Sequence, residues 1–143
     1  MKYHGEWARA SHLAPFMVEA SADLRPVDAL VPVPLHPSRR KQRGFSQTEK
    51  LAEALSREID VSVDLVLQRI RRTTPQVRLD AEGRQANVKG AFALAPGRSV
   101  SGMRLLLVDD VITTGATLGA CAQVLLAAGA SSVSVVTVAR ELN

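Results

Sequence analysis

The chain has 143 residues, of which 46% are hydrophobic and 22% charged, the balance of an ordinary globular protein with room for one domain and a real core. Cys121 is the only cysteine, which excludes an internal disulfide and a zinc site built from cysteines. The sequence contains neither the ~18 consecutive apolar residues of a membrane span nor the apolar segment of a secretory signal, so a cytoplasmic protein without membrane insertion is expected.

The net charge of +4 is concentrated in the middle of the chain. Residues 36–90 carry 12 Lys or Arg against 7 Asp or Glu, and the rest is close to neutral. A local positive field favours polyanions such as nucleic acids, membrane phosphates or small phosphorylated substrates. Because only five residues are aromatic, a protein that stacks single-stranded bases on aromatic side chains is disfavoured.

The hydrophobic pattern predicts helices and strands that alternate along the chain. Helical spacing predicts three helices, at residues 7–21, 45–59 and 116–128, the last of which stops at Gly129. Apolar or β-branched runs predict five strands, at residues 28–33, 63–70, 92–94, 105–108 and 133–138. This alternation favours a single α/β domain over residues 1–143, with a mostly parallel central sheet flanked by helices.

Residues 71–90 interrupt this pattern. The segment is basic and polar and has no apolar stripe, which predicts a long loop. A loop of this length in a compact domain is usually functional or mobile, and we expect a flexible basic loop here.

The most informative stretch runs from Leu105 to Leu118 and reads LLLVDDVITTGATL. Four apolar residues predict a buried strand, and its carboxyl end lies where open α/β sheets bind ligands. Asp109 and Asp110 follow this strand directly. Because they would repel a phosphate that they faced, they are expected to accept hydrogen bonds from sugar hydroxyls of the same ligand.

The turn after the two acids has the composition of a phosphate site. Gly115 allows the backbone to curl closely around a ligand, and the amides of residues 114–117 lie at a helix N-terminus, which favours an anion. Thr113, Thr114 and Thr117 add hydroxyl donors. The structural alternative is a strand end followed by an ordinary helix cap, but the length of the combined pattern favours a ligand site.

This stretch resembles the signature by which type I phosphoribosyltransferases bind 5-phosphoribosyl-1-pyrophosphate (PRPP). The resemblance implies the type I phosphoribosyltransferase fold, with a flexible loop that closes over the substrate. It implies that Asp109 and Asp110 are the catalytic, ribose-binding acids. The PRPP-binding set that it implies consists of these two acids with Thr113, Thr114, Gly115, Ala116 and Thr117.

Further motifs make the chain similar to the ComF family of competence-associated proteins, which are themselves similar to amidophosphoribosyltransferases. These motifs are VPVPLHP at 31–37, RKQRGFSQ at 40–47, PQ at 75–76 and RQANVKGAF at 84–92. Ser46 stands where the family usually has Asn. The family's cysteine-rich zinc-binding segment has no counterpart in this sequence, so we expect either a short member or a chain that begins after that module.

The resemblance also assigns the basic segments. The turn at Leu35 and His36 corresponds to the family's pyrophosphate loop, with Arg40 and Arg43 supplying charge, because arginine matches phosphate oxygens well. The alternative is a solvated basic loop, and His36 alone is more often structural. The stretch 69–90 corresponds to the flexible catalytic loop, and of its six basic residues Arg72 and Arg84 are the favoured pyrophosphate contacts, ahead of Arg69, Arg71, Arg78 and Lys89.

Phosphoribosyl transfer would require Mg²⁺ held mainly by substrate oxygens, with few protein ligands. The acceptor stays open: Thr113 stands where 6-oxopurine enzymes have an aspartate, whereas the resemblance to amidophosphoribosyltransferases suggests an amine. Two alternatives to an enzyme also stay open, a non-enzymatic adaptor in DNA uptake and a PRPP sensor. The expected partners are therefore PRPP, with proteins of the DNA-uptake machinery and a second copy of the chain as further candidates.

Overall fold

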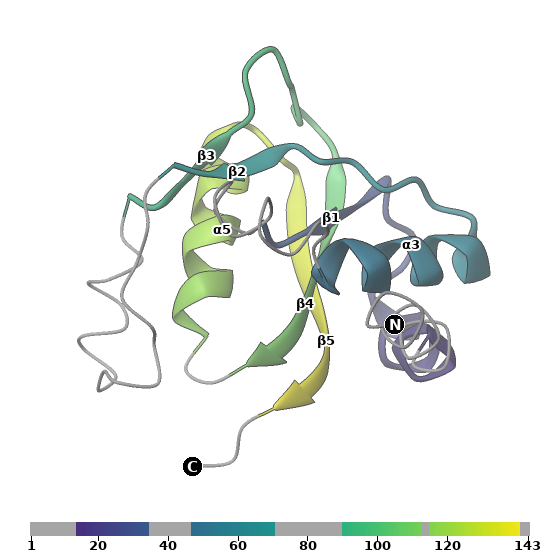
Figure 1. Cartoon of the computed structure of the whole chain (residues 1–143). Helices are drawn as coiled ribbons and strands as arrows, with labels where there is room; N and C mark the ends of the chain where they lie inside the picture. The colour runs from purple at the N-terminus through teal and green to yellow at the C-terminus, as the bar shows by residue number, and fades with distance from the viewer. Residues whose placement is uncertain (1–13, 35–46, 71–89, 113–114, 141–143) are drawn as a thin grey trace.

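The computed structural model describes residues 14–34, 47–70, 90–112 and 115–140, with only the backbone for 110–112 and 138–140. Residues 14–20 are helical. The labelled elements that follow are η1 (Ala22–Leu24), β1 (Ala29–Pro32), α3 (Gln47–Ile59), β2 (Leu67–Arg69), β3 (Phe92–Leu94), β4 (Arg104–Ile112), α5 (Ala116–Ala127) and β5 (Ser132–Arg140). Figure 1 shows their arrangement.

The described strands form two sheets. A parallel sheet has the order β1-β4-β5, so β4 lies in the centre, and β2 and β3 form a separate antiparallel pair. Leu105 to Val108 are completely buried, as expected for a central strand with helices on both faces. The predicted α/β fold with a parallel sheet and flanking helices is confirmed.

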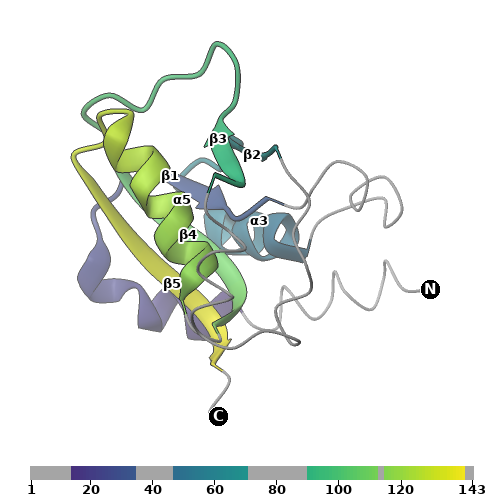
Figure 2. The same ribbon diagram turned by 90° about the vertical axis from the view of Figure 1, so that its left-hand side faces the viewer.

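Alternate residues of β4 enter two different hydrophobic cores. Leu105 and Leu107 pack with α5 and with the β2–β3 pair, whereas Leu106 and Val108 pack with α3 and the helix at 14–20. Figures 1 and 2 show α5 and α3 on opposite sides of the sheet. The central part of β4 is therefore packed between two layers.

Two predicted strands have different bounds in the structure. The strand predicted at 63–70 is paired only from Leu67 to Arg69, because the chain first passes β1 at a single bridge between Leu30 and Val63 and then leaves to join β3. The strand predicted to end at Val108 continues to Ile112, because β5 pairs with it over that whole length.

The predicted helices agree with the structure where it describes them. α3 and α5 occupy the expected stretches, and Gly129 follows the C-cap of α5 with φ of +103°. Of the first predicted helix, residues 7–13 lie outside the described residues, as does the basic segment 71–89. Within the described residues, none of the helices has the length and apolar character needed to cross a membrane.

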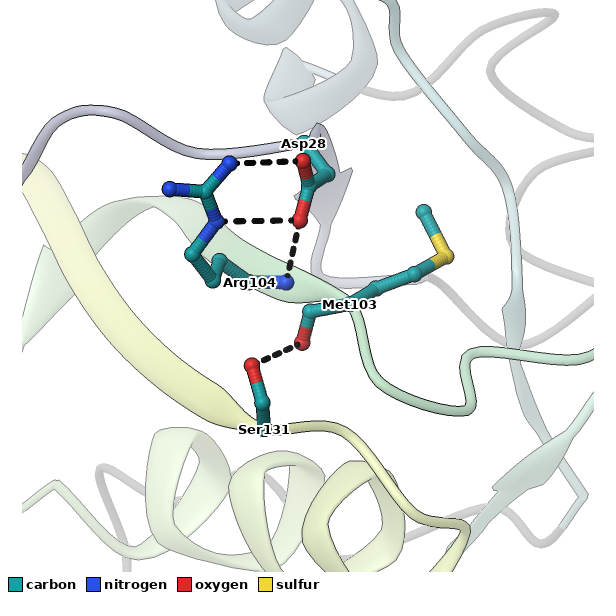
Figure 3. A network of polar contacts seen from close by, with 4 residues as sticks. All are labelled: Asp28, Met103, Arg104 and Ser131. Atoms are coloured by element: carbon teal, nitrogen blue, oxygen red, sulfur yellow. Dashed lines mark hydrogen bonds and ion pairs between the residues drawn. The ribbon is translucent and has the colours of Figure 1, made fainter.

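The amino-terminal ends of β1 and β4 are joined by an ion pair (Figure 3). The carboxylate of Asp28 accepts hydrogen bonds from the backbone N–H of Arg104 at 2.7 Å and from its guanidinium at 3.0 and 3.2 Å. The Arg104 guanidinium holds the pKa of Asp28 below its usual value. Beside it, the Ser131 hydroxyl donates to the carbonyl of Met103 at 3.3 Å. This polar cluster lies at the end of the sheet opposite to the two acids.

Candidate functional site

In the parallel sheet β1 ends before β4 and β5, which end together, and this difference leaves a ledge on β4. Pro32 of β1 is the last residue paired with β4, opposite Val108, whereas the pairing with β5 runs on to Ile112 opposite Arg140. Asp109 is thus the first residue of β4 beyond β1, and it still pairs with Thr137. The sequence predicted that the two acids follow the end of the strand. In the structure they lie within β4, because β5 supplies a pairing partner there. The Asp110 side chain lies outside the described part.

Asp109 is partly buried on the α5 side of the sheet, close to Cys121. The prediction that Cys121 is a buried apolar residue is confirmed, since its side chain is completely inaccessible. Burial, together with the negative charge of Asp109, raises the pKa of the thiol to about 12, and the positive charge of Arg69 opposes this shift. Asp109 thus lies at the border between the apolar core and the surface.

Gly115 begins α5 in a conformation that side chains rarely adopt. Its φ of +82° and ψ of 1° are left-handed, and its carbonyl accepts the first helical hydrogen bond, from Gly119, at 2.8 Å. A Cβ placed on Gly115 would meet no heavy atom of the described residues within 4 Å. Figure 1 shows this helix start beside the carboxyl end of β4.

The residues around Gly115 are only partly described. Ala116 is buried as the first residue of α5, and Thr117 in its first turn is partly buried. Neither the first turn nor the rest of α5 carries a charged side chain, so the contribution of the helix itself at this end is the positive end of its dipole. Thr113 and Thr114 lie outside the described residues.

Thr48 is a site-positioning residue that sequence reasoning missed. Its buried hydroxyl donates to the carbonyl of Val33 at 2.6 Å, and the Val33 N–H donates to the carbonyl of Val108 at 3.0 Å. These bonds join the start of α3 and the end of β1 to β4, one residue before Asp109. The only available signal was a hydroxyl in the first turn of a predicted helix. The pyrophosphate candidates Leu35, His36, Arg40 and Arg43 lie outside the described residues.

Arg69 is the described cation closest in sequence to the basic segment. It pairs in register with Phe92, and its guanidinium carbon lies 4.8 Å from the centre of the Phe92 ring. Its charge also reaches the Cys121 thiol. The favoured cations Arg72 and Arg84 both lie outside the described residues.

The comparisons with known proteins identify the class. A family model described as "Phosphoribosyl transferase domain" matches residues 46–142. The structure superimposes on the glutamine PRPP amidotransferase of B. subtilis with a TM-score of 0.60 and 21% identity, over 90% of this chain and 25% of the other. An adenine phosphoribosyltransferase gives a TM-score of 0.59 and 13% identity, over 94% and 69%. The chain belongs to the phosphoribosyl transferase domain family, and its fold is that of type I phosphoribosyltransferases.

Within that family the relatives are named competence and DNA utilization proteins, which confirms the ComF resemblance. Competence protein F of Haemophilus influenzae is 36% identical over 135 residues, 93% of this chain and 59% of that protein. The DNA utilization protein YhgH of Salmonella typhimurium is 38% identical over 127 residues, 88% of this chain and 55% of that protein. Competence protein ComFC of Bacillus subtilis is 36% identical over 118 residues, 78% and 44%. The chain thus spans between 44% and 59% of the length of these curated relatives.

Proposed function

We propose that the chain binds PRPP on the ledge between β4 and the start of α5, and transfers its phosphoribosyl group to an acceptor with release of pyrophosphate. One observation carries the proposal: Asp109 lies just beyond the end of β1, in the strand that leads to a left-handed glycine at a helix N-terminus. This arrangement offers an acceptor for sugar hydroxyls next to a turn suited to a phosphate.

The reaction would break the bond between the anomeric carbon and the pyrophosphate oxygen, and the acceptor would form the new bond with that carbon. The bonding electrons leave with pyrophosphate, so the ribose becomes cationic while the leaving group gains negative charge. Asp109 and Asp110 would hold the ribose hydroxyls, and the turn from Thr113 to Thr117 would hold the 5′-phosphate. Arg40, Arg43, Arg72 and Arg84, with the turn at Leu35 and His36, would stabilise the leaving pyrophosphate.

Mg²⁺ is part of this proposal. Among the described residues there is no group of three or more His, Cys, Asp or Glu that could hold a metal ion. Mg²⁺ commonly binds through one or two carboxylates together with substrate phosphates, so a site with Asp109 as its described carboxylate fits such an ion. The ion would neutralise charge on the pyrophosphate oxygens.

The acceptor is the least defined part. Thr113 cannot act as a carboxylate base, which disfavours the 6-oxopurines. The glutamine PRPP amidotransferase with the same fold makes an amine acceptor the first class to test. Pyrophosphate release in the presence of candidate amines would identify it.

Binding is tested with the Asp109→Asn/Asp110→Asn double variant. Thermal unfolding is measured with increasing PRPP and Mg²⁺, because a ligand that binds the folded state raises the transition temperature. We expect stabilisation of the native chain and none of the double variant, which should still unfold cooperatively. Glu19→Gln/Asp23→Asn removes the same charge from exposed positions near the amino-terminal helix and should respond like the native chain. Native-like stabilisation of the Asp109/Asp110 variant would contradict the site.

The names of the relatives support a second candidate, an adaptor in DNA uptake that uses the fold without turnover. Two of these relatives are named competence protein F and DNA utilization protein YhgH. DNA affinity that falls steeply with salt, without stabilisation by PRPP, would favour the adaptor. Stabilisation by PRPP without pyrophosphate release for any acceptor would instead favour a PRPP sensor, in which the ligand is bound and not consumed.

A further inference from the structure

Arg69 is held in a fixed position at the loop end of the β2–β3 pair. It lies opposite Phe92 in the register, and the next pairing, from the Ile70 N–H to the Ala91 carbonyl, closes the pair at 2.7 Å. The guanidinium stacks on the Phe92 ring, which is only 5% exposed and packs in the core with Leu107. The attraction between the guanidinium and the aromatic face restricts the rotamers of Arg69, so the β2–β3 pair sets the direction of this side chain.

Arg69 and Asp109 approach the same core residue from different elements. Cys121 of α5 is completely buried, and the charges of both residues act on its thiol in opposite directions. Arg69 belongs to β2, and Asp109 lies on the ledge of β4. Cys121 belongs to the same core as Phe92 and Leu107. Because Asp109 continues the alternation of Leu105 and Leu107 along β4, it lies on the face of the sheet that this core covers, and the Arg69 cation lies over Phe92 of the same core.

We propose that Arg69 is a positioning residue that acts through Asp109: it fixes the carboxylate at the edge of the α5 core and offsets its charge when a polyanionic sugar phosphate arrives. This inference rests on the proposed function for the identity of the ligand. The physical need is clear, because a carboxylate that accepts from ribose hydroxyls otherwise repels the phosphates of the same molecule. A cation held by Phe92 provides this compensation without contacting the ligand.

The first test uses the ligand-free chain. Chemical unfolding is measured for the native chain, Arg69→Met, Asp109→Asn and the double variant. If Arg69 holds Asp109, the loss of stability on Arg69→Met should shrink by at least about half when Asp109 is already Asn, since interacting residues are not additive. Additive losses would overturn the inference, whatever the chain does with PRPP.

The second test separates positioning from direct phosphate binding. Affinities of PRPP, ribose 5-phosphate and pyrophosphate are measured with Mg²⁺ for the native chain, Arg69→Met and Arg69→Lys. We expect Arg69→Met to weaken the two ribose ligands about tenfold, a coupling typical of contacting residues, and to leave pyrophosphate unchanged. Arg69→Lys, which keeps the charge, should recover most of the affinity. Equal weakening of pyrophosphate would mean that Arg69 binds the ligand itself and would overturn the inference.

The control is Arg98→Met. Arg98 follows β3 and is exposed, and it forms an ion pair with Asp64. Its variant should bind all three ligands like the native chain, and a loss equal to that of Arg69→Met would overturn the inference. If the native chain binds none of the ligands, the proposed function fails, while the unfolding measurements still decide whether Arg69 acts on Asp109.

Discussion

Replacing Gly115 with alanine separates the shape of the phosphate turn from the stability of the fold. With φ of +82° and no described heavy atom within 4 Å of the added Cβ, the substitution collides with none of the described residues, and its expected cost comes from the backbone. A left-handed conformation costs an ordinary residue about 1–2 kcal/mol, and the reduced freedom of the unfolded chain returns about 0.4–1 kcal/mol. The net loss should be about 1 kcal/mol, or about 3 °C in the unfolding temperature for a domain of this size.

The same substitution should cost far more in ligand binding. A turn that relaxes from the left-handed region reorients the amides at the start of α5, and each charge-assisted hydrogen bond lost to a phosphate is worth about 1.5–3 kcal/mol. We therefore expect PRPP affinity to fall at least about tenfold, measured by calorimetry with Mg²⁺.

Gly97→Ala is the matched control for Gly115→Ala. Gly97 has φ of +76°, also has no described heavy atom within 4 Å of an added Cβ, and lies in the exposed turn after β3. Both variants should lose similar stability, but only Gly115→Ala should lose affinity. Native affinity in a Gly115→Ala variant that shows the expected loss of stability would refute the phosphate turn.

Three further substitutions test the framework of the site. Thr48→Val leaves the buried Val33 carbonyl without its hydroxyl donor and should destabilise the fold by about 1–3 kcal/mol in urea unfolding, whereas Thr48→Ser should stay near the native value. Asp28→Asn tests the ion pair with Arg104: because the folded pKa of Asp28 is lowered from 3.8, its contribution is present above pH 3.8 and lost as pH falls through the lower folded value. The native chain should therefore lose more stability than this variant below about pH 4, and parallel acid unfolding curves would contradict this. Cys121→Ala tests the buried thiol: its folded pKa is raised to about 12 from 9.0, so its contribution is present below pH 9 and lost as pH rises towards 12. Between pH 8 and 10 the native chain should lose about 1 kcal/mol more than Cys121→Ala, and an equal loss in both would show that the thiol ionises normally.

Much of the fold is readable from local patterns. The apolar run at 105–108 predicts a buried strand, the β-branched run at 133–138 predicts a further strand, and the small apolar residues before Gly129 predict α5 and its end. These patterns do not predict how far the pairing between two strands extends. The continuation of β4 to Ile112 depends on β5, which lies more than twenty residues further along the chain.

The sequence predicts the motif of the candidate site, but it does not predict the residues that hold the motif in place. The acids and the glycine turn are consecutive in sequence, so composition and spacing suffice to select them. Thr48 and Arg69 act through contacts with Val33 and Phe92, fifteen and twenty-three positions away, and only the folded chain brings these pairs together. No periodicity distinguishes such residues from an ordinary helix-start hydroxyl or an ordinary surface arginine.

The ledge itself follows from the different extent of pairing on the two sides of β4. β1 ends at Pro32, and the Val33 N–H that follows donates to the Val108 carbonyl at 3.0 Å. Pro32 lacks its donor on the other edge of β1, the edge on which the Leu30 N–H donates to Ser62, so the proline does not weaken the pairing with β4. On the opposite side of β4, the pairing with β5 continues to Ile112. Among the described residues, Asp109 thus lies beyond the paired part of β1, while its pairing with Thr137 of β5 fixes its backbone. Under the proposed function, a sugar would meet a carboxylate whose backbone is already fixed, so its binding would not require the strand to be ordered first.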